Sequence, residues 1–90
     1  KRILYAENMA RKIVLHQKEG YISYYARMEE LEQELGTQFF RCHRGYLVNL
    51  AAVKNFDAGT ITLKNNEVIL LSKQKYNDFA AAYLAFLKKR

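Results

Sequence analysis

Basic side chains alternate with aromatic and apolar residues in one short run near the middle of the chain. The run covers residues 39–49 and has the sequence FFRCHRGYLVN. An extended backbone sends successive side chains to opposite faces, so this run can bury one face and present Arg41, His43 or Arg44 to an anionic partner. The alternation favours nucleic-acid binding.

Two further clusters of basic and amide side chains fall where we expect loops or the starts of elements. One covers residues 8–12 and the other residues 73–75. Binding residues concentrate on loops of a rigid β scaffold, because the scaffold fixes their spacing while the tips stay accessible. Three such tips could straddle a DNA duplex.

The side-chain types divide the candidates into base readers and backbone contacts. Arginine bonds bidentately to O6 and N7 of guanine in the major groove, asparagine and glutamine do the same to adenine, and lysine mostly contacts phosphates. We therefore predict that Arg11 and Arg44 read bases, with Asn8 and Gln74 as weaker candidates. The predicted phosphate contacts are Lys12, Arg41, His43, Ser72, Lys73 and Lys75.

Some of these residues also have structural interpretations. Arg41 suits a salt bridge to a glutamate as well as a phosphate, since a partly buried arginine usually finds a carboxylate. His43 suits a role in holding its turn together. The thiol of Cys42, between Arg41 and His43, could have a lowered pKa and act as a redox sensor. An inert, small hydrophobic side chain is the simpler interpretation of this cysteine.

Composition and charge limit the class of protein. Half of the 90 residues are hydrophobic and none is proline, which predicts one folded domain over residues 1–90. The formal net charge is +6, yet four glutamates lie between residues 27 and 35. A basic body with one acidic helix is expected of a protein that meets phosphates on one side. The single cysteine favours a cytoplasmic location, and no stretch is long and apolar enough for a membrane span.

Sequence patterns predict a mostly β fold. Runs of β-branched and aromatic residues indicate strands, while apolar residues spaced three and four apart indicate a helix from residue 28 to Gly36. The order of strands, helix, strands and helix predicts short antiparallel β-sheets with one short mid-chain helix and a C-terminal helix. The predicted strands are 3–6, 12–16, 21–26, 39–42, 46–48, 54–57, 60–63 and 67–71.

Turn and cap residues mark the joints between these elements. Gly59, after Ala58, and the pair Asn65 and Asn66 predict hairpin turns, because glycine and asparagine tolerate positive φ. Asn49 is expected to cap a one-turn helix at 50–53, and Ser72 to cap the C-terminal helix. That second helix start offers free N–H groups and a positive dipole end to a phosphate. Its last turn is expected to hold Lys88, Lys89 and Arg90.

The central run closely resembles the pattern F-x-R-x-H-R-[SG]-Y-[LIV]-V-N of the LytTR domain, the DNA-binding output module of many bacterial response regulators. Residues 3–7 also resemble the I-x-Y-I-E strand of that family, residues 28–32 its short acidic helix, and residues 70–73 its [IL]-P-V-S-[RK] segment. The resemblance implies short antiparallel sheets that bind DNA through loops inserted into successive major grooves. It also implies base contacts near Arg11, at Arg44 and at Lys73.

The chain departs from the family pattern in three places. An opening strand normally precedes the I-x-Y-I-E segment, so we expect a missing strand and an open sheet edge. Gly45 stands where serine is common, which should loosen the turn and remove a phosphate donor. Leu70 or Leu71 replaces the usual proline, a change that we expect to be neutral. The receiver domain that usually controls this module is also absent from the sequence.

Three functions are compatible with the sequence. The leading hypothesis is a sequence-specific transcription regulator domain of a bacterial two-component response regulator. It would need no cofactor and would bind direct repeats in promoter DNA as a homodimer formed through the missing receiver domain. A protein-interaction module would instead use the acidic helix and the open β edge. A metal-independent nuclease with His16 and His43 as acid and base is disfavoured, because two distant histidines have little specificity, and no residue spacing predicts a metal site.

Overall fold

The computed structural model describes residues 3–89, which form a mostly β structure with one short mid-chain helix and a C-terminal helix. This architecture confirms the predicted fold class. The elements, in chain order, are β1 (Ile3–Met9), β2 (Lys12–Gln17), β3 (Gly20–Tyr25), α1 (Met28–Leu35), η1 (Gly36–Gln38), β4 (Phe39–His43), β5 (Tyr46–Asn49), η2 (Leu50–Ala52), β6 (Val53–Phe56), β7 (Thr60–Leu63), β8 (Val68–Leu70), η3 (Lys73–Lys75) and α2 (Tyr76–Lys88).

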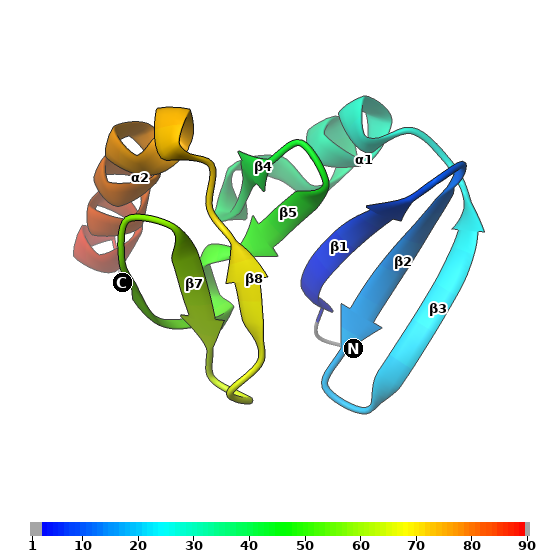
Figure 1. The fold of residues 1–90 in the computed structure, drawn as a ribbon, viewed down its shortest axis with the longest axis horizontal. Helices are drawn as coiled ribbons and strands as arrows, with labels where there is room; N and C mark the ends of the chain where they lie inside the picture. The colour runs from blue at the N-terminus through cyan, green and yellow to red at the C-terminus, as the bar shows by residue number, and fades with distance from the viewer. Residues whose placement is uncertain (1–2, 90) are drawn as a thin grey trace.

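The strands form two antiparallel sheets (Figure 1). The larger sheet has the strand order β3-β2-β1-β5-β4, and the smaller has the order β6-β7-β8. In the larger sheet, Glu7 near the end of β1 pairs with Tyr46 at the start of β5. The β1–β2 turn and the β4–β5 turn therefore lie at the same end of this sheet.

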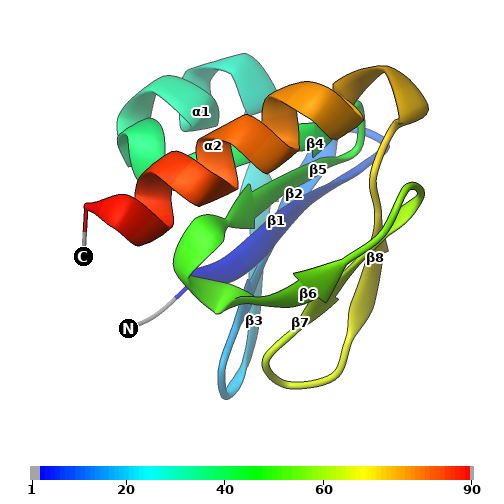
Figure 2. The ribbon, with the colours of Figure 1, turned by 90° about the vertical axis from the view of Figure 1, so that its left-hand side faces the viewer.

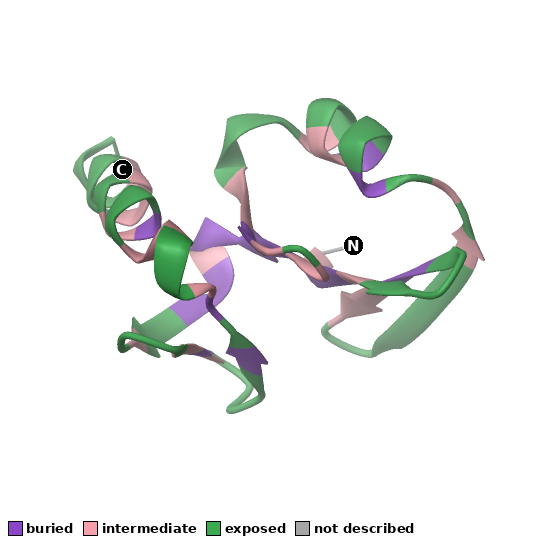
Figure 3. Cartoon of the chain, turned by 45° about the horizontal axis from the view of Figure 1, so that its top comes forward, coloured by how far each residue is buried: buried purple, intermediate pink, exposed green. Residues whose placement is uncertain are grey.

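The two faces of the larger sheet contribute to two different cores. Ala6, Ile13 and Leu47 pack on one face against Met28 and Leu31 of α1. On the other face, buried side chains join those of the smaller sheet, η2 and α2. This second core contains Tyr5, Cys42, Val48, Leu50, Ala52, Val53, Ile61, Leu63, Ile69, Leu71 and Phe79. Figure 2 shows α2 lying across the molecule beside β4, and Figure 3 shows that the outer sides of both helices are exposed.

Aromatic rings connect α2 to the smaller sheet. The ring of Phe79 is fully buried and lies edge-on to Phe40 and Phe56, with centroid distances of 5.6 and 4.9 Å. Tyr83, one helical turn later, stacks on Phe79 and contacts Phe56. Buried aromatic pairs of this kind add specific geometry to a large apolar contact area. They fix α2, and with it the position of η3 just before it.

Most strand boundaries agree with the predicted ones to within one residue, but β1 is three residues longer. Asn8 therefore lies in a strand and not in the predicted loop, paired with Ile13 of β2. Only Ala10 and Arg11 form the turn, with Ala10 at a φ of 61°. The polar composition of this segment obscured a strand that is stabilised by pairing on both of its sides.

The predicted helix cap at Ser72 is wrong. Its side chain makes no capping hydrogen bond, and the single 3-10 turn of η3 separates it from α2. The backbone of Ser72 is bonded instead, since its N–H donates to the carbonyl of Cys42 at 2.8 Å and its carbonyl accepts from Lys75 at 2.9 Å. The predicted last-turn residue Arg90 lies outside the described residues.

The two later hairpin turns are formed by different means. Asn66 has a φ of 74°, as predicted, whereas Gly59 has no positive φ. The carboxylate of Asp57 accepts instead from the N–H groups of Gly59 and Thr60, at 3.0 and 2.9 Å. These bonds hold the pKa of Asp57 below its usual range. The predicted cap at Asn49 is confirmed, because its side-chain oxygen accepts from the N–H of Ala51 at 3.0 Å.

Candidate nucleic-acid interface

Backbone hydrogen bonds bring the three basic clusters to one end of the molecule. The N–H of Asn8 donates to the carbonyl of Gly45 at 2.9 Å, and the N–H of Ser72 donates to the carbonyl of Cys42 at 2.8 Å. The β4–β5 turn is thus bonded to the end of β1 on one side, while β4 is bonded to the segment before η3 on the other. Figure 1 shows the β1–β2 turn, the β4–β5 turn and η3 along the upper edge of the molecule.

Two side chains fix the β4–β5 turn by bonding to the peptide group between Arg44 and Gly45. The Nδ1 atom of His43 accepts from the N–H of Gly45 at 3.0 Å, and Nη2 of Arg41 donates to the carbonyl of Arg44 at 2.8 Å. The side chain of Arg44 is exposed. When Nδ1 accepts a hydrogen bond, the neutral imidazole has its proton on Nε2, where it can serve as a donor. The turn therefore presents the guanidinium of Arg44, which forms no salt bridge within residues 3–89, on a fixed backbone.

Gly45 does not leave this turn loose, because its N–H and its carbonyl are both bonded. A Cβ atom placed on Gly45 would meet Nδ1 of His43 at 3.5 Å, which is ordinary van der Waals contact. The Cβ atom of a serine therefore fits at this position.

Arg41 is already engaged by protein groups. Besides its bond to Arg44, its Nη1 atom lies 3.7 Å from a carboxylate oxygen of Glu32 on α1. Its Nε atom is buried and has no hydrogen-bond partner among the described residues. This geometry favours the salt-bridge interpretation and connects α1 to the β4–β5 turn. The predicted phosphate contact at Arg41 stays a prediction.

The β1–β2 turn presents its basic side chains with less support. Arg11 is exposed and forms no salt bridge within residues 3–89. Lys12 is exposed as well, with its ammonium 5.6 Å from the centroid of the Tyr25 ring on β3. A cation over an aromatic face at this distance is weakly attracted to it, so Lys12 is the better oriented of the two.

The third cluster lies on the single turn of η3. Lys73 and Gln74 are exposed, while Ser72 and Lys75 are half-buried. Their backbone position is set by the bond from Ser72 to Cys42. All ten predicted site residues therefore lie in or next to three connected segments at one end of the molecule.

Cys42 does not have the lowered pKa that its basic neighbours suggested. Its side chain is fully buried, with Sγ 3.5 Å from the carbonyl oxygen of Leu70. Burial raises the pKa of the thiol to about 12, and the charge of Arg41 offsets this only in part. The thiolate, the reactive form, is thus suppressed. This favours the inert hydrophobic interpretation.

The two histidines of the nuclease hypothesis have separate partners. Nε2 of His16 is 2.9 Å from a carboxylate oxygen of Glu7, and its ring stacks on Tyr5 at 4.2 Å. His43 bonds the β4–β5 turn and contacts Tyr46. Across residues 3–89, no group of His, Cys, Asp and Glu side chains could hold a metal ion. No helix in this part of the chain is long and apolar enough to cross a membrane.

Sequence reasoning gave no role to Arg27, which is exposed just before α1 and lines a cleft together with Asn8, Arg11 and Arg41. Its position next to a run of glutamates suggests an ordinary solvated charge. Only the arrangement of β1, β4 and α1 in space brings it close to the predicted base readers.

Comparisons with known proteins support the fold. A family model described as the LytTr DNA-binding domain matches residues 1–83. Among solved structures, the chain is similar to the LytTr DNA-binding domain of a putative methyl-accepting/DNA response regulator from Bacillus cereus. The TM-score is 0.81 at 22% sequence identity, and the match covers 90% of this chain and 80% of that one. No curated protein sequence matches the chain.

Proposed function

We propose that this chain, which belongs to the LytTR family of DNA-binding domains, is the DNA-binding domain of a bacterial response regulator. The observation that supports this most is the connection of three basic clusters at one end of a rigid β scaffold. The family is not enzymatic, so the nuclease hypothesis is set aside. The remaining questions are which residues contact DNA and in what arrangement.

In the proposed complex, Arg11 and Arg44 bond to base edges from two neighbouring turns. Both guanidinium groups are exposed and without a carboxylate partner in residues 3–89. A free guanidinium on a positioned turn suits bidentate bonding to guanine. Asn8 and Gln74 are the weaker base-reading candidates, since Asn8 lies back from the tip on β1.

The remaining candidates contact the DNA backbone and set the orientation of the domain. Nε2–H of His43 and the lysine ammonium groups are donors directed at phosphates. Arg41 contributes mainly by holding Arg44, with a phosphate as a further partner. The proposed backbone contacts are Lys12, Arg41, His43, Ser72, Lys73 and Lys75.

We further propose that the domain acts in the bacterial cytoplasm on direct repeats in promoter DNA. Two copies would be joined by receiver domains, and joining raises the local concentration of the second domain at the second repeat. The single buried cysteine and the basic surface support this setting.

Selection from random duplexes tests the proposed function. The purified domain is incubated with random duplex DNA at moderate salt, and the bound fraction is sequenced. A short enriched element, with copies one or two helical turns apart, is expected. Recovery of unenriched DNA would mean that the basic end is a nonspecific electrostatic patch, and the interaction-module hypothesis would then replace this proposal.

A further inference from the structure

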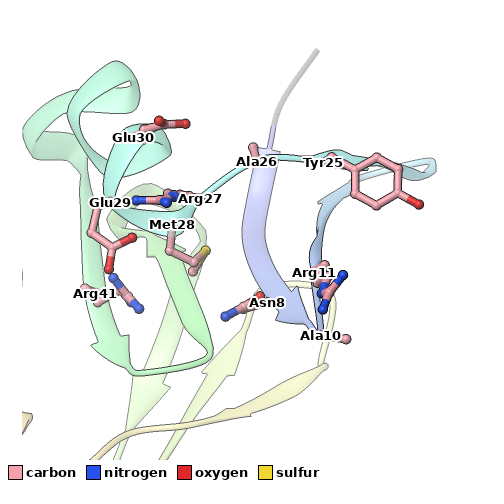
Figure 4. Close-up of a pocket in the computed structure, with 10 residues that line it drawn as sticks. All are labelled: Asn8, Ala10, Arg11, Tyr25, Ala26, Arg27, Met28, Glu29, Glu30 and Arg41. Carbon is pink, nitrogen blue, oxygen red and sulfur yellow. The ribbon is translucent and has the colours of Figure 1, made fainter.

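An open cleft of about 740 Å³ lies between the β1–β2 turn, the start of α1 and β4 (Figure 4). Three arginines from three different segments line it: Arg11, Arg27 and Arg41. Asn8 lines it as well, and its amide points into the space between β1 and β4. The cleft thus gathers guanidinium groups from parts of the sequence that are far apart.

The cleft also adjoins the two turns that we assign to base reading. Arg11 lies on one of these turns. Asn8 and Arg41 are hydrogen bonded to Gly45 and Arg44 of the other turn. The N–H of Asn8 bonds to the carbonyl of Gly45 at 2.9 Å, so the two turns lie too close together to enter successive major grooves, which are about 34 Å apart. A duplex that contacts both turns through one groove places the sugar-phosphate backbone that borders this groove beside them. The cleft occupies that position.

The guanidinium of Arg27 is available to contact a phosphate of the DNA backbone. Arg41 is engaged by Glu32, whereas Arg27 forms no salt bridge within the described residues 3–89. Glu29 and Glu30 also line the cleft. The positive end of the α1 dipole stabilises their carboxylates there. Figure 4 shows the Glu30 carboxylate directed away from the arginines and the Glu29 carboxylate directed toward Arg41.

We propose that the cleft binds a phosphate of the DNA backbone beside the two base-reading turns, with Arg27 as its principal contact. This inference rests on the proposed DNA-binding function and adds a contact that the sequence did not suggest. The planar guanidinium bonds a phosphate through two parallel N–H groups. Glu29 opposes the phosphate, so it lowers the affinity for every duplex alike.

The test measures duplex affinity as a function of salt for Arg27→Ala, with the selected duplex and a scrambled one. Loss of one phosphate contact is expected to weaken both complexes alike, by about tenfold at low salt. The slope of log affinity against log salt is expected to fall in magnitude by about 0.9. Glu29→Gln is expected to strengthen both complexes, because it removes a repulsive charge.

Lys64→Ala is the matched control, since this exposed lysine lies by the β7–β8 turn, away from the three clusters. Thermal unfolding checks that each variant is folded. Unchanged affinity and salt slope for Arg27→Ala would overturn the cleft proposal while leaving the proposed function in place. Loss of sequence preference in this variant would also overturn it, because Arg27 would then read bases. Absence of specific binding by the wild-type domain would refute the proposed function itself.

Discussion

The β4–β5 turn and the β1–β2 turn have the same proposed task, but they are built differently. In the β4–β5 turn, the side chains of Arg41 and His43 bond to the carbonyl and the N–H of the peptide group between Arg44 and Gly45. Within residues 3–89, the β1–β2 turn is closed only by the strand pairing of Met9 with Lys12. A preorganised contact loses less conformational entropy on binding. Equal charge therefore does not mean an equal contribution to binding, and Arg44 should discriminate bases more strongly than Arg11.

The largest expected effect is a loss of sequence preference on changing Arg44 to Ala. A bidentate contact to a base pair contributes about 1–3 kcal/mol of discrimination, and Arg44→Ala should lose most of it at one base position. Arg11→Ala should lose less, because its turn is less constrained. Competition binding with single-base variants of the selected duplex measures both. A larger loss of sequence preference for Arg11→Ala than for Arg44→Ala would mean that the β1–β2 turn discriminates bases more strongly.

The next effect concerns the bond that holds the rigid turn. His43→Ala removes the acceptor for the N–H of Gly45 and should lower affinity for the selected duplex by about 1 kcal/mol. The difference in affinity between the selected duplex and its single-base variants should also decrease toward the difference measured for Arg44→Ala. Gly45→Ser serves as the counterpart, since it keeps the His43 bond, adds a donor and should bind at least as well as wild type. Equal discrimination in His43→Ala and wild type would show that this bond is not needed.

Backbone strain in the other turn gives a smaller effect on stability. Ala10 has a φ of 61°, a region that costs an alanine roughly 1 kcal/mol compared with glycine. Ala10→Gly should therefore raise the midpoint of thermal unfolding slightly, while Arg11 becomes no better ordered. A lower midpoint would mean that Ala10 is not strained in the folded protein.

The smallest effect concerns the thiol beneath the rigid turn. Burial raises the pKa of Cys42 from 9.0 to about 12, so the folded protein has almost no thiolate at neutral pH. Alkylation by iodoacetamide should remain slow in the native protein as pH rises through 9, and become fast in urea. Rapid labelling of the native protein at pH 7 would support the interpretation of Cys42 as a redox sensor.

Local signals in the sequence predicted much of the fold. Gly36 ends α1 with a φ of 80°, Asn66 supplies the positive φ of its turn, and Asn49 caps η2 through its own side chain. Each of these features depends on residues within a few positions of one another. Local residue patterns were therefore sufficient to predict the fold class and the approximate location of the three basic clusters.

Long-range partners decided the features that the sequence did not predict. The strand at Asn8 pairs with Ile13 and is also bonded to the distant Gly45, and the backbone at Ser72 is set by Cys42. Arg27 meets Arg41 across a cleft only because α1 packs on the sheet face that also contains Ala6 and Leu47. Such contacts join segments that are distant in sequence, so no local pattern indicates them.

The central claim is that three connected clusters form one DNA-binding surface. Backbone amide chemical shifts of the isotope-labelled domain, followed as the selected duplex is added, test it most directly. The largest changes are expected in residues 8–12, 41–45 and 72–75, with Arg27 also affected and the β7–β8 turn at 64–67 nearly unchanged. Changes centred on the β7–β8 turn or on the exposed strand β3, with the three clusters unaffected, would contradict the claim.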